Sequence, residues 1–322
     1  MTSVVAGRDL VKHFELSEGW FHTTRINAVN GVSIHAEKGE SLGIVGESGC
    51  GKSTLARMLV GIEKPTEGHV EFEGKAVDGP GDWRKLRRSV MYVFQDPYSS
   101  LPPRMTVRDI VVDPLVINRV GAPRDRSARV VEMLDLVGIP TIDLDRYPAE
   151  FSGGQRQRIS IARALILNPR ILICDEITSG LDVSIQAQVL NLLLNLQERL
   201  EVGYVFISHD LRVVRYLCND VAVMYFGKVV ERGSAEELFS RPLHPYTRGL
   251  LDSIPDHRKR RSDVREPLAR IAGEPPSTLE IPTGCPYASR CPIAKAVCRE
   301  VDPPETDHGG RKVRCHFAGE LN

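Results

Sequence analysis

One eight-residue stretch constrains the fold of this chain more than any other part of the sequence. Residues 46–53, with the sequence GESGCGKS, fit the pattern G-x-x-x-x-G-K-[ST] at every fixed position. The apolar stretch Leu42–Val45 before it is typical of a buried strand, and Thr54–Leu59 after it can continue as a helix. A strand, a glycine-rich turn and a helix in this order form a phosphate-binding loop. The alternative, a glycine and serine turn that binds nothing, does not require this spacing or these flanking elements.

Each type of residue in this loop has a role in holding phosphate. Glycines let the backbone curl around an anion and direct its N–H groups inward, and the helix start adds a partial positive charge. Lys52 supplies a full charge to the β- and γ-phosphates, and the Ser53 hydroxyl is a ligand for Mg²⁺. The nucleotide-binding residues that this motif predicts are Gly46, Glu47, Ser48, Gly49, Cys50, Gly51, Lys52, Ser53 and Thr54.

Composition places the chain among ordinary globular proteins. Its 322 residues correspond to about two average domains. The 42 lysines and arginines balance the 42 aspartates and glutamates, so we expect no general attraction to nucleic acid or anionic lipid. No apolar run approaches the ~18 residues that cross a bilayer, and charged residues among the first twenty argue against a signal peptide. The expected location is therefore the cytosol, unless a partner holds the protein at a membrane.

Further apolar segments alternate with helical patterns, which predicts an α/β fold with a buried parallel sheet. These segments are Val90–Phe94, Ile171–Cys174 and Val205–Ile207. Ligands of such sheets lie at the carboxyl ends of the strands, where Asp175 and Glu176 follow one segment. We expect Asp175 to hold Mg²⁺ through water and Glu176 to act as a general base. An acidic pair alone is more typical of a helix cap, but the phosphate loop favours the catalytic interpretation.

A second candidate anion site has the sequence FSGGQ, at Phe151–Gln155, before a helical pattern over Arg156–Leu167. Ser152 can cap that helix, and Gly153 and Gly154 expose N–H groups at its positive end. The chain has only one phosphate loop. Two cassettes that pair head to tail would explain both sites, because each helix end would contact the γ-phosphate held by the other. A plain capped helix start is the alternative that Ser-Gly-Gly alone favours.

Together these motifs resemble, in content and order, those of ATP-binding cassette (ABC) subunits. Gln95 matches the glutamine that contacts Mg²⁺ and senses the γ-phosphate, and His209 matches the histidine that contacts the γ-phosphate and the catalytic base. The resemblance implies catalytic roles for Glu176, His209 and Gln95, and Mg²⁺ ligation by Ser53, Gln95 and Asp175. It implies that nucleotide held by the opposite cassette is contacted by Ser152, Gly153, Gly154, Gln155 and Asp182.

Two positions carry the resemblance less directly. Phe14 matches the aromatic residue that stacks on adenine, although Trp20 and Phe21 are competing candidates for that role. Ile177 stands where a proline is common after the catalytic base, so we expect the turn behind Glu176 to be altered without loss of a catalytic group.

The resemblance is closest to one branch of the family, the bacterial oligopeptide, dipeptide and nickel importers, and to the second, F-type, cassette of those systems. It is carried by residues 93–101, 182–188 and 244–248 and by the terminal cysteines. It implies an ATPase that powers solute import at the cytoplasmic face of the membrane, with di- and oligopeptides as the first candidate cargo and nickel or another small solute as the alternative. The implied partners are a paralogous ATPase, two membrane permeases and an extracytoplasmic substrate-binding protein.

Composition changes near residue 255, where we place a domain boundary. The resemblance implies that residues 1–255 form the ATP-binding domain, with a parallel-sheet core, an antiparallel β subdomain and a helical subdomain at about 96–168 that receives the permeases. Within it, Asp220–Gly233 is typical of a hairpin. Residues 256–322 are predicted to form a small C-terminal extension that begins with a basic linker at 258–261.

The extension contains four of the seven cysteines, with five, six and sixteen residues between successive members: Cys285, Cys291, Cys298 and Cys315. A structural zinc site usually contains a C-x₂₋₄-C pair, which is absent here, although His308 and His316 are possible substitutes. Thiolates from wider loops suit an iron–sulfur cube, and the resemblance to the importer branch also implies a [4Fe–4S] cluster. Zinc and metal-free thiols are the alternatives.

Other function classes fit the sequence less well. DNA-repair members of the family place a coiled coil between the nucleotide motifs, but Lys52 and Ser152 lie only a hundred residues apart without sustained heptads. Ribosome-acting members generally carry two cassettes in one chain, whereas this chain has one. A regulatory iron–sulfur protein with a vestigial ATPase is disfavoured, because Lys52, Asp175, Glu176 and His209 are all present.

Overall fold

The computed structural model describes residues 3–18, 22–254 and 282–320. The chain divides into two compact units. Unit 1 comprises Met1–Ala6, His35–Ser41 and Glu71–Ile207, and unit 2 comprises Gly7–Ile34, Leu42–Val70 and Ser208–Asn322. Among the described residues, none of the helices has both the length and the apolar character that crossing a membrane requires.

The sheet of unit 1 confirms three predicted strands. Its strands are parallel, with β7 between the other two: β6 (Val90–Val93), β7 (Ile171–Asp175) and β8 (Gly203–Ser208). Every residue of β7 and β8 is buried, as expected for apolar runs in a sheet that is covered on both faces. Some strand ends differ from the prediction: Phe94 lies outside β6, Asp175 is the last residue of β7, and β8 extends beyond the predicted segment at both ends. Asp175 is therefore fixed by strand pairing and not by a loop.

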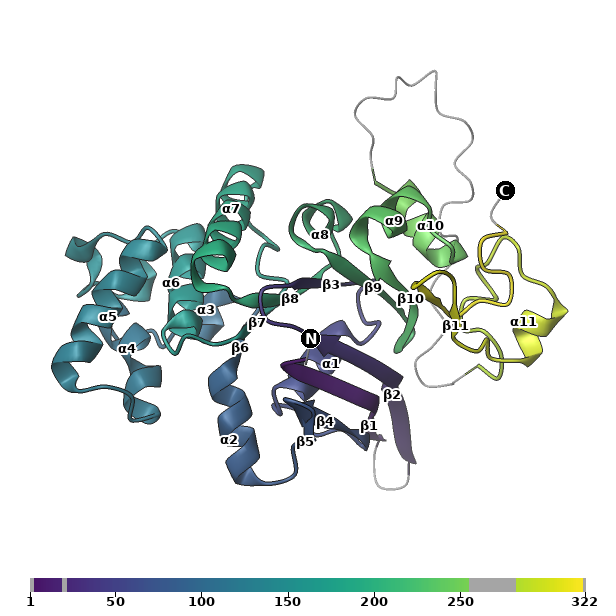
Figure 1. Ribbon diagram of the computed structural model, residues 1–322, viewed down its shortest axis with the longest axis horizontal. Coiled ribbons are helices and arrows are strands. Elements are labelled where there is room, and N and C mark those ends of the chain that lie inside the picture. The colour runs from purple at the N-terminus through teal and green to yellow at the C-terminus, as the bar shows by residue number, and fades with distance from the viewer. Residues whose placement is uncertain (1–2, 19–21, 255–281, 321–322) are drawn as a thin grey trace, which may run out of the picture. The chain divides into compact units, whose positions relative to one another are not determined.

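Three helices of unit 1, α4, α5 and α6, lie together (Figure 1), within the range predicted for a helical subdomain. The bounds are α2 (Pro80–Ser89), α3 (Pro97–Ser100), α4 (Val107–Ile117), α5 (Pro123–Leu136), 3-10 turns at Thr141–Asp143 and Pro148–Glu150, α6 (Gly153–Leu165) and α7 (Val183–Leu200). Helix α6 begins three residues before the predicted Arg156 and ends before Leu167. It begins early because Ser152 and Gln155 bond to each other's backbone N–H, which fixes the first turn at Gly153.

The sheet of unit 2 confirms the predicted hairpin and extends it. Its strands, in spatial order, are β11 (Thr306–Asp307), β12 (Lys312–Val313), β10 (Lys228–Ser234), β9 (Asp220–Tyr225) and β3 (Ser41–Val45). Phe226 and Gly227 turn the hairpin with positive φ angles of 49° and 75°, as the tightest hairpins require. Strand β12 pairs with β10 in antiparallel register, Glu231 opposite Val313. The C-terminal segment thus completes this sheet, which the predicted boundary near residue 255 did not anticipate.

A second, four-stranded sheet has the order β2-β1-β4-β5. Its strands are β1 (Val5–Glu18), β2 (His22–Ala36), β4 (Glu67–Phe72) and β5 (Lys75–Ala76). Strands β4 and β5 are antiparallel, consistent with the predicted antiparallel subdomain. The remaining helices belong to unit 2 and are α1 (Lys52–Leu59), α8 (Leu211–Leu217), α9 (Ala235–Ser240), α10 (Pro245–Asp252) and α11 (Ala296–Glu300).

Candidate active site

The phosphate loop lies in unit 2 and connects β3 to α1, as predicted, and its last two residues, Lys52 and Ser53, begin α1. Gly46 and Gly51 have φ angles of 156° and 103°. A Cβ atom at Gly46 would lie 2.2 Å from the carbonyl oxygen of Met224, and one at Gly51 would lie 2.1 Å from that of Ala28. Only glycine fits such close backbone approaches. The two fixed glycines of the motif are therefore required by packing as well as by backbone conformation.

Lys52 lies over the loop that precedes it. Its side chain is buried, and its Nζ donates hydrogen bonds of 2.9 Å to the carbonyl oxygens of Gly46 and Glu47. A buried cation needs such partners. Cys50 is buried beside it, and burial raises the pKa of the Cys50 thiol, with Lys52 acting in the opposite direction. Cys50 is thus a protonated packing residue of the loop, and Lys52 is the group that carries its charge.

A second group of predicted residues gathers in unit 1, at the carboxyl ends of β6 and β7. The Nε2 of Gln95 donates a hydrogen bond of 3.0 Å to Oε2 of Glu176. Asp175 is 2% exposed, and the hydroxyl of Tyr92 donates to its Oδ2 at 2.6 Å. We call these four residues the carboxylate edge. The predicted magnesium ligand, the predicted base and the predicted sensor are neighbours here.

The backbone of Glu176 has a conformation that is uncommon outside glycine. Its φ is 47°, in the left-handed region that costs an ordinary residue about 1 kcal/mol. The Glu176 amide donates to the Ile207 carbonyl at 3.0 Å, and its own carbonyl accepts from the Ser179 amide and hydroxyl at 3.0 and 2.7 Å. These bonds hold the turn although Ile177, and not proline, follows. Ile177 is buried, so packing replaces the missing ring constraint.

The residues predicted to face a second cassette also lie in unit 1. Ser152 caps α6, and Gln155 completes the reciprocal pair of cap bonds. A Cβ atom at Gly154 would lie 2.4 Å from Cγ2 of Ile185, so a larger residue here would have to displace the Ile185 side chain. Ser152 and Gly153, at the start of α6, are exposed to solvent. Asp182, at the start of α7, is exposed as well.

Two other predicted residues belong to unit 2. His209 is exposed and follows β8, and the next residue, Asp210, caps α8 by accepting from the Arg212 amide at 2.9 Å. Phe14 is half-buried on β1, with Nζ of Lys12 4.9 Å from the centre of its ring. The competing residues Trp20 and Phe21, and the basic linker at 258–261, lie outside the described residues.

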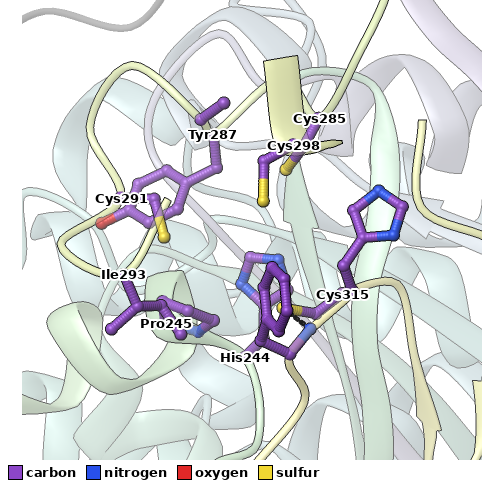
Figure 2. Close-up of a pocket in the computed structure, with 11 residues that line it drawn as sticks. His244, Pro245, Cys285, Tyr287, Cys291, Ile293, Cys298 and Cys315 are labelled. Carbon is purple, nitrogen blue, oxygen red and sulfur yellow. Dashed lines mark hydrogen bonds between the residues drawn. The ribbon is translucent and has the colours of Figure 1, made fainter. Parts of the chain in front are cut away.

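The structure brings the four C-terminal thiols to one pocket of unit 2. Figure 2 shows the side chains of the cysteines around this pocket with His244 and Tyr287. The amide of Cys285 donates to the Cys298 carbonyl at 2.8 Å. His316 lines the same pocket, whereas His308 does not and lies 3.0 Å from the Thr306 hydroxyl. The pocket is lined by His244, Pro245, Cys285, Tyr287, Ala288, Cys291, Ile293, Cys298, Cys315, His316 and Phe317.

The chemistry of this pocket fits an iron–sulfur cluster better than a carboxylate-bound metal. Its lining has four sulfur donors and no Asp or Glu, which is the donor set that clusters use. Burial raises the pKa of both Cys285 and Cys315 to about 11, so a metal would have to displace protons to bind. In the described part of the chain, no three His, Cys, Asp or Glu side chains are arranged as a site for a metal ion. The cluster therefore stays a prediction.

Two residues of the candidate site were not predicted from the sequence. Tyr92 stands opposite Ile173 in the register of β6 and β7, and only that register brings its hydroxyl to Asp175. Arg290 forms an ion pair with Glu47 of the phosphate loop, 243 residues away. A hydroxyl within an apolar strand is a weak signal for Tyr92, and no local signal points to Arg290.

Comparison with known proteins decides the family. Residues 29–179 match the family model for the ABC transporter, and residues 230–298 match the model for the oligopeptide/dipeptide transporter, C-terminal region. The chain is 48% identical over 324 residues to the di/tripeptide transport ATP-binding protein DppF of Pseudomonas aeruginosa, with 100% of this chain and 99% of that protein covered. The chain belongs to the ABC transporter family. This cassette is also 49% identical to the oligopeptide transport ATP-binding protein AppF of Bacillus subtilis, with 96% of each chain covered.

Solved structures agree with this assignment. The structure of cbiO1 from Clostridium perfringens, part of the ABC transporter complex cbiONQ, matches with a TM-score of 0.64 and 31% identity over 74% of this chain and 92% of that one. A dimeric ATP-binding cassette in a post-hydrolysis state, bound to ADP and Pi, also has a TM-score of 0.64, with 30% identity over 72% and 98% of the two chains. The resemblance predicted from the motifs is confirmed, and the cassette is an ATPase of the transporter class.

Proposed function

We propose that this cassette binds and hydrolyses MgATP to power the import of di- or oligopeptides. The observation that carries the proposal is that one chain joins a complete phosphate loop to a C-terminal region of the oligopeptide/dipeptide transporter type. Relatives that match it over nearly their whole length are named as peptide transport ATP-binding proteins. Import of nickel or another small solute is the second candidate, because the motifs of the nucleotide site do not depend on the cargo.

The proposed reaction is attack of water on the γ-phosphorus, with departure of ADP. The amides of the phosphate loop and Lys52 hold the β- and γ-phosphates. Glu176 accepts the proton of the attacking water, and its contact with Gln95 orients its carboxylate. His209 contacts the γ-phosphate. Mg²⁺ is held by Ser53, Gln95 and Asp175, and Phe14 stacks on adenine.

The proposed working state is a head-to-tail pair of cassettes, this chain and a paralogous ATPase. In that state, nucleotide bound to one cassette is also contacted from the other by Ser152, Gly153, Gly154, Gln155 and Asp182. Exposure of Ser152, Gly153 and Asp182 supports this role, as does the dimeric state of a similar solved cassette. ATP closes the pair and hydrolysis opens it.

The proposed location is the cytoplasmic face of the membrane, where two permeases hold the cassette and receive cargo from an extracytoplasmic substrate-binding protein. The helical subdomain, at about 96–168 within an ATP-binding domain of 1–255, contacts the permeases. Its apolar side chains on the surface support that contact, since Ile117 and Ile142 are 70% and 89% exposed.

In the extension, 256–322, we propose a [4Fe–4S] cluster with four thiolate ligands, which are Cys285, Cys291, Cys298 and Cys315. The supporting observation is that these thiols line one pocket without a carboxylate. Anaerobic purification followed by iron, sulfide and zinc analysis tests this assignment. Four iron and four sulfide per chain are expected, zinc alone would replace the cluster by the zinc alternative, and a metal-free, fully folded extension would contradict both.

Transport tests the main proposal. The cassette is assembled with its paralogue, the two permeases and the substrate-binding protein in vesicles, and uptake of a labelled dipeptide is compared with uptake of nickel. We expect ATP-dependent peptide uptake that Lys52→Ala abolishes. Uptake of nickel without uptake of any peptide would overturn the peptide assignment while leaving the ATPase role intact.

A separate measurement tests the head-to-tail pair. Cysteine is placed at Ser152 of this cassette and at the phosphate loop of its partner, in chains whose other reactive thiols are blocked. We expect a crosslink between the two polypeptides in saturating ATP and none without nucleotide. Failure to join the chains at any ATP concentration would contradict the shared site.

A further inference from the structure

Glu47, the second residue of the phosphate loop, is bound through its side chain to the C-terminal segment. Nη1 of Arg290 donates to one carboxylate oxygen of Glu47 and Nη2 donates to the other, both at 2.9 Å. Two parallel bonds between a guanidinium and a carboxylate fix direction as well as distance. The residue that precedes Cys291 in the extension therefore holds a residue of the nucleotide site.

This ion pair is not an ordinary surface salt bridge. The side chain of Arg290 is 5% exposed and that of Glu47 is 27% exposed. Nη1 of Arg290 also donates to the Tyr225 hydroxyl at 3.2 Å. The hydrogen bonds to Glu47 raise the pKa of Arg290 above its ordinary value, so the guanidinium is charged at every physiological pH. Removing one partner of such a pair leaves a poorly solvated charge behind.

The backbone of Glu47 is also held by a hydrogen bond, to a tyrosine that packs against the C-terminal segment. Its amide donates to the Tyr246 hydroxyl at 2.9 Å. The rings of Tyr225, Tyr246 and Tyr287, which we call the tyrosine cluster, pack with centroids 4.6 to 5.4 Å apart. The amide of Arg290 donates to the Tyr287 carbonyl at 3.0 Å, so the same turn supplies the guanidinium and one ring of the cluster.

All three polar parts of Glu47 are thus engaged. Its carboxylate binds Arg290, its amide binds Tyr246, and its carbonyl accepts from Lys52 at 2.9 Å. A carboxylate in a loop that binds anions would repel phosphate if it were left without its cation. Without Arg290 the Glu47 side chain would no longer restrain the loop backbone. The amides of the loop bind phosphate only when they point toward the same place.

We propose that Arg290 is a positioning residue of the nucleotide site, which neutralises Glu47 and holds the phosphate loop in the conformation that accepts phosphates. This inference rests on the proposed binding of MgATP. It gives the C-terminal segment a role in nucleotide affinity that does not depend on what the cysteine pocket holds. Figure 2 shows how near this segment lies to that pocket, since Tyr287 and Cys291, on either side of Arg290 in sequence, both line it.

The test is nucleotide affinity of the full chain, measured with a fluorescent ATP analogue and Mg²⁺. Arg290→Ala should weaken binding at least about tenfold, because an unpaired carboxylate is left beside the phosphates. Adding Glu47→Gln to that variant removes the unpaired charge and should recover part of the lost affinity, although the paired bonds that hold the loop are still missing. The matched control is Lys295→Ala, which removes an exposed pair with Glu320 in the same segment and should change affinity less than about twofold.

The assembled importer gives a second readout. Arg290→Ala should raise the KM for ATP and leave kcat within about twofold, because the carboxylate edge is unchanged. If Arg290→Ala does not fold, Arg290→Lys keeps the charge but loses the paired bonds, and should weaken binding about threefold.

Three results would overturn the inference: a folded Arg290 variant that binds ATP as well as the unchanged chain, equal weakening by Lys295→Ala, or no recovery in the double variant. If the unchanged, folded chain binds no MgATP at all, the proposed function fails and this inference fails with it. If that chain binds MgATP and the Arg290 variants do too, only this inference fails.

Discussion

The phosphate loop and the carboxylate edge are supported in different ways. Glu47 of the loop is held by Arg290 and Tyr246, which lie 243 and 199 residues further along the chain. Asp175 and Glu176 of the carboxylate edge are held by Tyr92 and Gln95 from the neighbouring strand and the turn after it. The backbone of the phosphate loop is fixed by its glycines, but its carboxylate at Glu47 depends on the distant cation Arg290. The carboxylate edge, in contrast, is supported by the pairing of β6 and β7.

This difference separates the effects expected from substitution. Disturbing the carboxylate edge should change the chemical step and leave nucleotide binding in place, because the sheet remains. Disturbing the support of the loop should change stability and binding together, because the tyrosine cluster is buried. Four substitutions test whether effects on turnover and effects on stability can be separated between the two regions.

The largest effect is expected at the carboxylate edge. Glu176→Gln keeps the shape of the side chain but cannot accept a proton, so turnover should fall by about 10²- to 10⁴-fold. ATP binding should be retained, since Lys52 and the phosphate loop are unchanged. Single-turnover hydrolysis and nucleotide affinity of the assembled complex are the measurements. Near-normal hydrolysis would refute the role of Glu176 as base.

The next largest effect is expected in the support of the loop. Tyr287 is 3% exposed and packs on Tyr225 and Tyr246, so Tyr287→Ala should cost about 3 kcal/mol of local stability. Faster hydrogen exchange in residues 282–320 would show this loss. The control is Tyr147→Ala, at a side chain that is 47% exposed, where a much smaller change is expected. Equal effects of the two changes would contradict the packing role of the cluster.

The support of the loop should also weaken in mild acid. His244 is fully buried, and burial lowers its pKa to about 3. In the unfolded chain His244 binds a proton near pH 6.5, whereas in the folded chain it stays neutral down to about pH 3. The free energy of unfolding is therefore highest above pH 6.5 and decreases as the pH falls toward 3. Between pH 7.5 and 5.5 the loss should be about 1 kcal/mol.

Urea unfolding at the two pH values measures this loss. The matched variant is His244→Asn, because asparagine can still accept the hydrogen bond from the Tyr246 amide at the start of α10 but does not titrate. A pH dependence as steep in the variant as in the unchanged chain would assign the effect to other groups.

The smallest effect is expected from removing one hydroxyl at the carboxylate edge. Tyr92→Phe deletes the bond to Asp175, and a hydrogen bond to a charged group contributes about 1.5 kcal/mol, or about tenfold in a rate. Turnover should fall by up to that factor, with a higher Mg²⁺ requirement as the specific signature. Tyr98→Phe, at an exposed ring in the same part of unit 1, should leave both unchanged. An unaltered Mg²⁺ requirement in Tyr92→Phe would contradict its role beside Asp175.

The parts of the site that the sequence predicted are those with a local cause. The phosphate loop, the cap at Ser152 and the two acids at the carboxyl end of β7 each depend on residues within a few positions, so their spacing is visible in the sequence. Tyr92 could not be predicted because strand register decides which residue faces Asp175. Arg290 could not be predicted because its partner is 243 residues away. The left-handed backbone of Glu176 follows from contacts with Ile207 and Ser179 that no local pattern contains.

The pairing of β12 with β10 has a consequence for solubility. Strand β10 has seven residues, and an exposed strand of that length offers unpaired backbone groups to other molecules. The C-terminal segment covers part of it with strands of only two residues each, β12 and then β11. Such short outer strands offer few unpaired backbone groups with which a strand of a neighbouring molecule could pair. A chain cut before residue 282 would lack β12 and leave the edge of β10 unpaired. Such a chain is expected to self-associate more readily than the whole protein.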